Sequence, residues 1–335
     1  MSRIKTCVSL YSLQDEYLNK RMNLKDIVYF LKENGVEGIE ILPDQMIHGA
    51  PNPSEETLKY WDEIITKTGM TPVITDVFLN TNLYDNRQLT KKECVELLKQ
   101  EVKLTSRLGM KLIRLVSMTP AFVLEPLLPT LEEYQVTVAL EVHAGMAFDN
   151  PKTQEFIQEM KRLNSPYIGL VIDTGIFCRK LPRVVENYNK SIGGTDEIYD
   201  FVRARFGEGI DMRRYFIAND GLTPEFEALI KNDVDRFFAA TCDGYENLPY
   251  TVLDEYMPYI KHFHFKLFEM TEEGVEYSMD YKGLLAYLHE KNYDGYVSTE
   301  YEGNRFVPAG EPMKEKEQVL AHQAYIRKCL KEIQG

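Results

Sequence analysis

Four side chains that could bind a divalent cation fall near the ends of four successive apolar segments of the chain. They are Glu141 in VALEVHAG, Asp173 in GLVIDTGIF, His264 in KHFHFKLF and Glu300 in YVSTEYEG. A lone charge is costly to bury in such a segment, so one shared cation explains the four residues more simply than four separate ion pairs. The sequence therefore predicts a metal site.

Each of the four residues, taken singly, has another explanation. Glu141 or Glu300 could be a buried acid paired with a lysine or arginine, and Asp173 could cap the following helix. Their coincident positions favour the shared site. Three carboxylates and one imidazole suit Mn²⁺ first, with Mg²⁺ or Co²⁺ as alternatives, better than a thiolate-bound structural zinc.

A cation held in this way could bind a ketone oxygen and an adjacent hydroxyl. It would stabilise the enediolate that forms when a proton leaves the carbon beside the carbonyl. Glu141 and Glu300 are the candidates for base and acid. His143 shares a strand face with Glu141, and it is either a second base over the substrate or a structural histidine bonded to a carboxylate.

Other polar residues near these segments are candidates for substrate contact or for structural pairing. Lys266 and Arg305 could bind substrate hydroxyls or a carbonyl, although Lys266 could instead pair with a ligand carboxylate. Arg114 is ambiguous in the same way. We expect Glu40 to form a salt bridge at the rim and His262 to lie in the core or behind the metal ligands.

The remaining histidines and the aromatic residues do not point to one function. His48, His289 and His322 lie in helix or loop segments, and we expect them at the surface. The 21 Tyr and 16 Phe residues could line a sugar or polyphenol cleft, but barrel and helix packing use the same residues. No Ser-His-Asp order, Walker loop or dinucleotide fingerprint occurs.

The elements that must position these residues alternate regularly. Short β-rich apolar segments alternate with helix-period segments over eight rounds, which predicts a parallel α/β fold. The strands are expected at residues 4–10, 35–42, 71–79, 111–116, 137–143, 168–175, 260–268 and 295–301. The main helices between them are expected at 24–35, 54–68, 90–108, 125–133, 151–163, 281–292 and 314–333.

Eight rounds favour a closed (β/α)8 TIM barrel, in which functional side chains come from the C-terminal ends of the strands. The alternative, an open doubly wound sheet, usually has a glycine-rich loop after the first strand, and LYSLQDEY contains no glycine. No linker divides the chain, so residues 1–335 are expected to form a single domain. A helical insertion after strand six is predicted at 177–259, as a lid or partner surface. Its helices are expected near 196–206, 223–231 and 252–259.

Composition limits the partners and the compartment. The 335-residue chain has a formal net charge of −13 without a dense Lys/Arg stripe, so nucleic acid and anionic membranes are poor partners. Its 44% hydrophobic and 27% charged residues supply a core without a membrane span. The five cysteines form no CxxC pair, and polar residues follow MSRIKTCVSL where a signal peptide would continue. Cytoplasmic residence is expected.

The motifs resemble the sugar-phosphate isomerase/epimerase group of xylose isomerase-like barrels, which includes keto-sugar epimerases and inosose dehydratases. The resemblance spans nearly the whole chain and is marked by LEVH, IDTG, HFK and TEYEG. It implies that Glu141, Asp173, His264 and Glu300 bind the metal. Many relatives carry a histidine three residues after the strand-six aspartate, where this chain has Ile176, so one substrate contact is missing.

Within this group the chain resembles the large (alpha) subunit of C-glycoside deglycosidases, through LEVHAGMAFDNP and through GLVIDTGIF followed by a long insertion. The resemblance implies metal-dependent cleavage of the carbon–carbon bond between a 3-oxo-sugar and a flavonoid or similar aglycone. It also implies a small β-sandwich partner subunit in a hetero-oligomer. A glutamate would remove the proton on sugar C2, the aglycone would leave C1 by β-elimination, and His143 would manage a proton on the phenolic aglycone.

Two other functions stay open. Reprotonation of the enediolate in place of elimination would make the protein a metal-dependent ketose epimerase or isomerase, and an inosose-type dehydratase shares the same first step. A sugar-binding or scaffold subunit that had lost catalysis would bind little metal. The base could be Glu141, His143 or Glu300.

Overall fold

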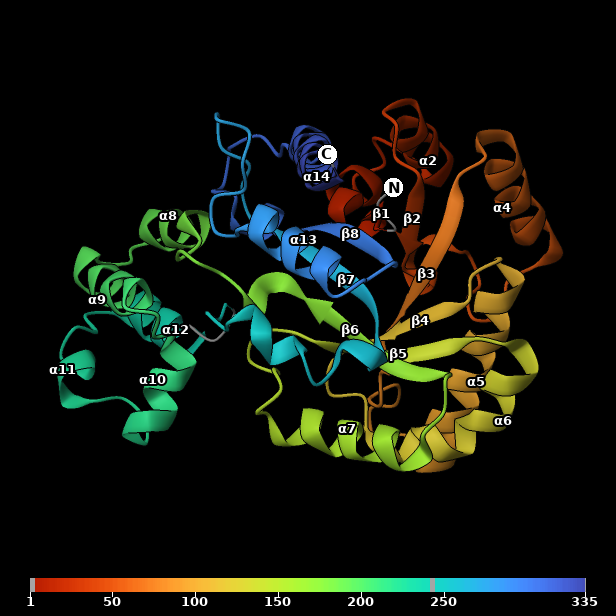
Figure 1. Cartoon of the computed structure of the whole chain (residues 1–335), viewed down its shortest axis with the longest axis horizontal. Helices are drawn as coiled ribbons and strands as arrows, with labels where there is room; N and C mark the ends of the chain where they lie inside the picture. The colour runs from red at the N-terminus through yellow and green to blue at the C-terminus, as the bar shows by residue number, and fades with distance from the viewer. Residues whose placement is uncertain (1–3, 242–244, 335) are drawn as a thin grey trace.

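The strands of the chain close into one parallel barrel (Figure 1). In this computed structural model, residues 4–241 and 245–334 are described. Each strand pairs with the next, and the last returns to the first. The strands are β1 (Lys5–Ser9), β2 (Gly38–Ile41), β3 (Thr71–Val77), β4 (Leu112–Leu115), β5 (Thr137–Val142), β6 (Ile168–Asp173), β7 (Ile260–Leu267) and β8 (Tyr296–Tyr301). The predicted α/β TIM barrel is confirmed.

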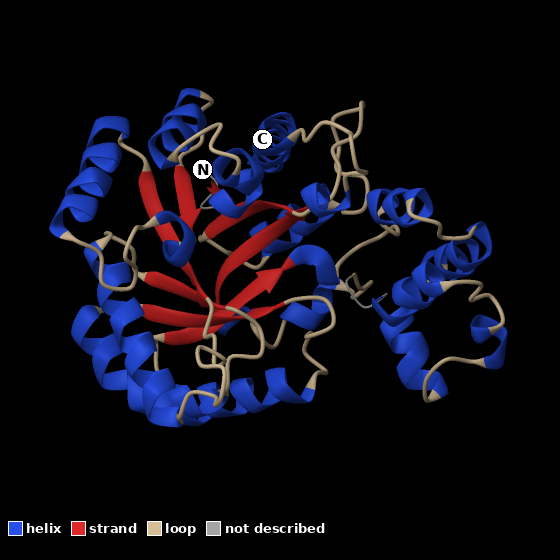
Figure 2. Cartoon of the chain, turned by 180° about the vertical axis from the view of Figure 1, so that it is seen from behind, coloured by secondary structure: helices blue, strands red, loops and turns tan. Residues whose placement is uncertain are grey.

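Helices surround the barrel on its outer face (Figure 2). Those between consecutive strands lie close to their predicted bounds. The longer ones are α2 (Leu24–Glu33), α4 (Glu55–Thr68), α5 (Lys91–Arg107), α6 (Leu124–Tyr134), α7 (Pro151–Leu163), α13 (Tyr281–Glu290) and α14 (Glu315–Gln334). Short turns at the strand ends are η1 (Leu10–Leu13), α1 (Gln14–Leu18), α3 (Pro43–Met46), η2 (Ala121–Val123), η3 (Thr174–Ile176) and η7 (Gly303–Phe306).

Local sequence determines where these helices begin and end. The Thr90 hydroxyl accepts a hydrogen bond from the Glu93 backbone N–H, and the Glu93 carboxylate accepts one from Thr90 in return, which starts α5. Asn150 caps α7, and a proline occupies its first position. Gly69, with a φ of 59°, ends α4 in the left-handed conformation that glycine adopts easily. These ends return the chain to the next strand.

The barrel interior has an apolar floor and a polar upper part. Side chains two residues apart on a strand share one face, so the interior is built in layers. The buried floor cluster contains Ile74, Ala139 and Val171. Two residues further along the same strands lie the acidic side chains of Asp76, Glu141 and Asp173. The floor closes the barrel below and leaves the acidic layer at the C-terminal end.

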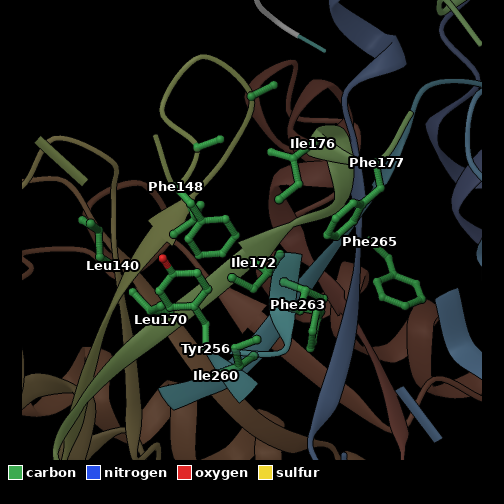
Figure 3. Close-up of a cluster of buried hydrophobic side chains, with 14 of the residues drawn as sticks. Leu140, Phe148, Leu170, Ile172, Ile176, Phe177, Tyr256, Ile260, Phe263 and Phe265 are labelled. Atoms are coloured by element: carbon green, nitrogen blue, oxygen red, sulfur yellow. The ribbon is translucent and has the colours of Figure 1, made fainter. Parts of the chain in front are cut away.

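Outward-facing side chains of β5 to β7 pack into the hydrophobic core shown in Figure 3. Phe265 stacks on Tyr281 of α13, with ring centroids 4.5 Å apart. Phe148, which follows β5, and Tyr256, which precedes β7, stack with ring centroids 4.2 Å apart. Stacked rings add to the hydrophobic stabilisation, so this core holds the strands that carry the predicted ligands.

The chain between β6 and β7 forms helices that lie beside the barrel (Figure 1). They are α8 (Arg183–Ser191), α9 (Asp196–Gly207), α10 (Met212–Asn219), α11 (Pro224–Glu227) and α12 (Asp233–Thr241), followed by the turns η5 (Tyr250–Leu253) and η6 (Met257–Tyr259). The predicted helix at 196–206 is confirmed, whereas the one at 223–231 is reduced to the single turn α11. The helix at 252–259 is wrong, since a proline within it leaves only short 3₁₀ turns. The single domain and its 177–259 insertion stay predictions.

Within the described part of the chain, no helix is both long and apolar enough to cross a membrane. Cys7, Cys94, Cys178 and Cys329 are buried free thiols. Cys242 lies outside the described residues.

The surface position predicted for His322 is wrong, although His48 and His289 are exposed. His322 is buried in α14 with Nδ1 3.0 Å from the Thr299 hydroxyl. The same hydroxyl accepts a hydrogen bond from Gln323. His322 and Gln323 of α14 therefore face β8, where both form hydrogen bonds with the Thr299 hydroxyl. Burial lowers the pKa of His322 to about 3.

His322 makes the stability of the fold depend on pH. Its folded pKa lies below the value of about 6.5 in the unfolded chain, so the unfolded chain binds more protons below pH 6.5. The free energy of unfolding should therefore fall as the pH falls from 6.5 towards 3, by about 2 kcal/mol between pH 7.5 and pH 5. We expect His322→Asn to remove this part of the pH dependence in denaturant titrations. His289→Asn on α13 is the control and should keep it, and an unchanged pH dependence in His322→Asn would contradict the assignment.

Candidate metal centre

The four predicted ligands meet at the C-terminal ends of β5 to β8. Glu141, Asp173, His264 and Glu300 are all buried, and one donor atom from each lies within 4.8 Å of the others. The parallel register places Asp173 beside His264 on neighbouring strands. The barrel thus brings together residues that are up to 159 positions apart in the chain, counted from Glu141 to Glu300. Their donor atoms are close enough to share one ion.

His264 lies at the centre of this group. Its Nδ1 is 3.2 Å from Oε1 of Glu141 and 3.3 Å from Oε1 of Glu300. Although these distances are short, the angles do not make a hydrogen bond, and Nδ1 has no hydrogen-bond partner. A buried nitrogen directed at two carboxylate oxygens without a hydrogen bond is a donor atom that a cation can use.

Glu40 contacts the opposite side of the same imidazole. Its Oε1 lies 2.9 Å from Nε2 of His264, and its Oε2 lies 3.2 Å from Nε2 of His262. The rim salt bridge predicted for Glu40 is therefore wrong, because β2 turns this carboxylate into the closed barrel. His262 is buried behind the ligands as predicted. A carboxylate behind a histidine ligand fixes the orientation of its ring.

Arg114 of β4 holds the acidic layer from the side. Its Nη2 lies 3.0 Å from Oε2 of Glu141, and its Nη1 lies 3.1 Å from Asp76. The structure thus places Arg114 on the carboxylate of a predicted ligand. Asp76 is absent from the predicted site residues, although an acid in the apolar segment TPVITDVFL carries the same signal as the four ligands.

Lys266 holds the other side of the layer. Its Nζ is 2.7 Å from Asp173, 3.2 Å from Oε2 of Glu300 and 3.2 Å from Glu302. Lys266 therefore pairs with the carboxylates of two predicted ligands, which is the structural role considered for it from the sequence. Arg305 donates to Glu302 at 2.8 Å and leaves 59% of its side-chain surface exposed, so it remains accessible to a substrate.

The buried charges of this mouth do not balance. Two buried cations, Arg114 and Lys266, face the buried carboxylates of Glu40, Asp76, Glu141, Asp173 and Glu300. Burial raises the pKa of Asp76 well above its usual value, more than Arg114 lowers it, which leaves four ionised carboxylates against these two cations and the protonated form of His264. A divalent cation that displaced the His264 proton would balance the negative charge that then remains.

The same imbalance acts on the individual ligands. Burial alone would lower the pKa of His264, but Glu40 and Glu300 outweigh it and raise this pKa well above its usual value. Burial alone would raise the pKa of Glu141, but Arg114 and His264 together outweigh it, and the pKa falls to about 2. An ionised buried carboxylate beside an imidazole that is stabilised as a cation marks a place that attracts positive charge.

His143 follows β5 and is half-buried at the mouth. Its Nδ1 lies at hydrogen-bonding distance from the Ala144 carbonyl, which can only accept, so in the neutral imidazole Nδ1 carries the proton and Nε2 is an acceptor. This contact is with the backbone, whereas the structural role considered for His143 from the sequence required a neighbouring carboxylate. Glu246 steadies this loop by accepting a hydrogen bond from the Gly145 N–H at 2.7 Å. No feature of the sequence indicates that role for Glu246.

A cavity of about 330 Å³ lies over the predicted ligands, and we call it the metal cavity. Its wall includes Glu141, Asp173 and Glu300. A volume of this size suits a small ligand such as a monosaccharide. Ile176 is fully buried in the hydrophobic core and does not line the metal cavity, so the chain offers no substrate contact from that position.

Comparison with known proteins places this chain in a family. Residues 28–216 match the model of the xylose isomerase-like TIM barrels, which is more than half of the chain. The protein belongs to this family.

Its relatives narrow the resemblance further. The C-glycoside deglycosidase alpha subunit of Arthrobacter globiformis is 26% identical over 309 residues, covering 88% of this chain and 83% of the relative. The 3'-dehydrocarminate deglycosidase alpha subunit of a Microbacterium species is 23% identical, covering 98% of this chain and 96% of the relative. The predicted resemblance to deglycosidase alpha subunits is confirmed. The solved structure of an L-ribulose 3-epimerase is similar in fold, with a TM-score of 0.55, 13% identity and coverage of 100% of this chain and 96% of that one.

Removal of one predicted ligand should remove the metal. We expect the chain, dialysed against Mn²⁺, to retain about one ion per chain by elemental analysis and to melt at a higher temperature than the chelator-treated protein. Glu300→Gln should lose most of this ion because it replaces a charged donor with a weak one. Glu101→Gln, which replaces a carboxyl group away from the predicted ligands, is the control and should keep the ion. Equal Mn²⁺ in Glu300→Gln and wild type would contradict the site.

Glu40 should affect metal affinity without touching the metal. Glu40→Gln removes the charge behind His264, and loss of such a supporting carboxylate typically weakens metal affinity by about 10- to 100-fold. Isothermal titration with Mn²⁺ measures this change. Glu101→Gln, which replaces a carboxyl group away from the predicted ligands, should bind Mn²⁺ like the wild type. An unchanged Mn²⁺ affinity in Glu40→Gln would show that Glu40 does not support the ligand.

Proposed function

We propose that this chain is the alpha subunit of a metal-dependent carbon–carbon lyase that cleaves the C-glycosidic bond of 3-oxo-C-glycosides. The observation that carries the proposal is the convergence of Glu141, Asp173, Glu300 and His264 Nδ1 beneath a cavity of about 330 Å³. Similarity to deglycosidase alpha subunits over 88% of the chain supports this choice of reaction. We extend the same proposal to the individual site residues.

The donor set fits a divalent cation held by Glu141, Asp173, His264 and Glu300, with Mn²⁺ as the first choice and Mg²⁺ or Co²⁺ as alternatives. When bound, such a cation polarises the 3-keto group of the sugar and stabilises the negative charge that develops on its oxygen.

The two glutamates both face Nδ1 of His264 and are the proposed proton carriers. Each turns Oε1 towards His264 and holds Oε2 against a cation, Arg114 for Glu141 and Lys266 for Glu300. This anchoring keeps both carboxylates in position without a change of rotamer. One of them takes the proton from sugar C2, and the proton is acidic because C2 neighbours the ketone.

The electrons of the reaction then balance without a co-reactant. The pair from the broken C2–H bond forms a double bond between C1 and C2. The bond between C1 and the aglycone carbon breaks, its electron pair leaves with the aglycone, and that carbon gains a proton. His143, with Nε2 as an acceptor at the mouth, is proposed to move a proton on the phenolic aglycone. Arg305 is the proposed contact for sugar hydroxyls, while Lys266 and Arg114 orient the glutamates.

The proposal includes a partner. Because the relatives are named alpha subunits, we propose that the chain works in a hetero-oligomer with a small β-sandwich subunit. Cytoplasmic residence, and the absence of nucleic-acid and membrane partners, stay predictions from charge and composition. Reprotonation at C2 in place of elimination would make the same site an epimerase or isomerase.

Release of the free aglycone tests the reaction. The chain is co-expressed with its neighbouring small open reading frame and given a 3-oxo-C-glucoside of a flavonoid with Mn²⁺ or with a chelator. We expect chromatography to show aglycone release that needs Mn²⁺. Glu141→Gln and Glu300→Gln should each lower turnover by at least about 100-fold, since general acid–base groups typically contribute 10²- to 10⁴-fold.

Glu101→Gln is the matched control for loss of an acid and should keep wild-type turnover. Two results would refute the lyase. One is undiminished release by the Glu141→Gln and Glu300→Gln variants. The other is full-rate interconversion of free keto-sugars by the chain alone without release of aglycone, which would establish the epimerase.

A further inference from the structure

A second cavity of about 400 Å³ adjoins the metal cavity, and we call it the aromatic cavity. Both cavities are lined by His143, Lys266, Glu302 and Arg305. The two spaces therefore share one wall of polar residues, with His143 at their boundary. A ligand too large for the metal cavity can extend past His143 into the second space.

The far wall of this second cavity is aromatic. It is lined by Tyr188 of α8, Phe237 of α12, Phe268 after β7 and Phe306 of η7. The Phe306 ring lies edge-on to Tyr188, with centroids 6.1 Å apart, and 6.4 Å from the Phe268 ring. These are the separations at which aromatic rings attract one another, so the wall is ready to accept another ring.

Phe237 adds a partly exposed apolar side chain to this wall. This side chain is 63% exposed, although the neighbouring Phe238 in the same cavity is only 2% exposed. An exposed large apolar side chain at a cavity commonly marks a place where a ligand covers it. The helices between β6 and β7 thus contribute a ligand-facing surface.

The wall shared with the metal cavity has the opposite character. The exposed Arg305 guanidinium and the Lys266 ammonium are cationic, and His143 presents an acceptor nitrogen. Cations and an imidazole beside aromatic rings suit a ring that carries hydroxyl groups, because they bind and polarise phenolic oxygens.

We propose that the aromatic cavity binds the aglycone as a planar, hydroxylated aromatic ring system, with the carbon bonded to sugar C1 beside His143. The inference rests on the proposed function, because the sugar half of the same substrate occupies the metal cavity. Tyr188 and Phe237 then make α8 and α12 determinants of aglycone specificity, which gives the helical segment between β6 and β7 a role in recognition.

A third cavity, of about 850 Å³, is larger but fits the aglycone less well. Among its described lining residues, only Phe78 and Val116 also line the metal cavity. Its wall includes Leu83 and the carboxyl of Glu101, whose pKa is raised by burial to about 7. It reaches neither His143 nor the two cations. An aglycone in that space would be out of contact with the groups that can protonate it.

Binding of a free hydroxylated flavone tests the site without turnover. The Mn²⁺-loaded chain, together with its partner subunit, is titrated with the flavone by calorimetry. We expect Phe237→Ala and Phe306→Ala to weaken the affinity by roughly 10-fold each, through loss of ring contact. The matched control Leu83→Ala removes a similarly exposed side chain from the third cavity and should leave the flavone affinity unchanged.

A second measurement separates this inference from the proposed function. Deuterium exchange at C2 of a 3-oxo-sugar without an aglycone, measured on the wild type, reports the chemistry of the metal cavity alone. Exchange together with flavone binding that is insensitive to Phe237 and Phe306 would overturn the aglycone site and keep the function. Flavone binding that depends on these rings, without exchange, would overturn the function and keep the site. Loss of flavone affinity in Leu83→Ala would assign the aglycone to the third cavity and overturn the proposal.

Discussion

An excess of buried negative charge at the barrel mouth is the constraint on which the rest of the structure depends. Burying unbalanced charge costs free energy, and the chain tolerates it because each carboxylate has a defined partner. Glu40 contacts His264, Glu141 contacts Arg114 and Asp173 contacts Lys266. The imbalance that is unfavourable for folding is also what would attract a cation to the predicted site. The apolar floor and the outer core must therefore provide the stability that the mouth does not.

Strand β7 connects the layers of the site. Its alternate residues His262, His264 and Lys266 all point into the barrel, because side chains two apart on a strand share one face. His262, the lowest, contacts Glu40, and His264, the middle one, contacts the predicted ligand Glu141. Lys266, the highest, reaches Glu302 at the rim. A shift of one residue in the register of β7 would remove all three from the interior at once. Correct pairing with β6 and β8 is thus a condition for the site.

The helices between β6 and β7 show where local patterns stop being informative. Residues 196–206 have a clear apolar face, and the helix predicted there is present as α9. Helix α8 has few apolar residues, and it buries Val185 together with the polar Glu186 and Asn189. Its position depends on contact with η7 from the far end of the chain, which no local pattern contains. The same contact creates the aromatic wall beside the metal cavity.

The amino-acid sequence by itself determined the eight strands and the four predicted ligands, because alternation, caps and charges in apolar segments are local properties. Asp76 carried the same local signal and could have been predicted. Only the tertiary structure decided that Glu40 and His322 are buried. It also decided that Arg114 and Lys266 hold the carboxylates of predicted ligands, and that Glu246 supports the His143 loop. The physical reason is closure of the barrel. It brings β2 next to the interior face of β7 and α14 onto β8, and these contacts join residues that no sequence spacing relates.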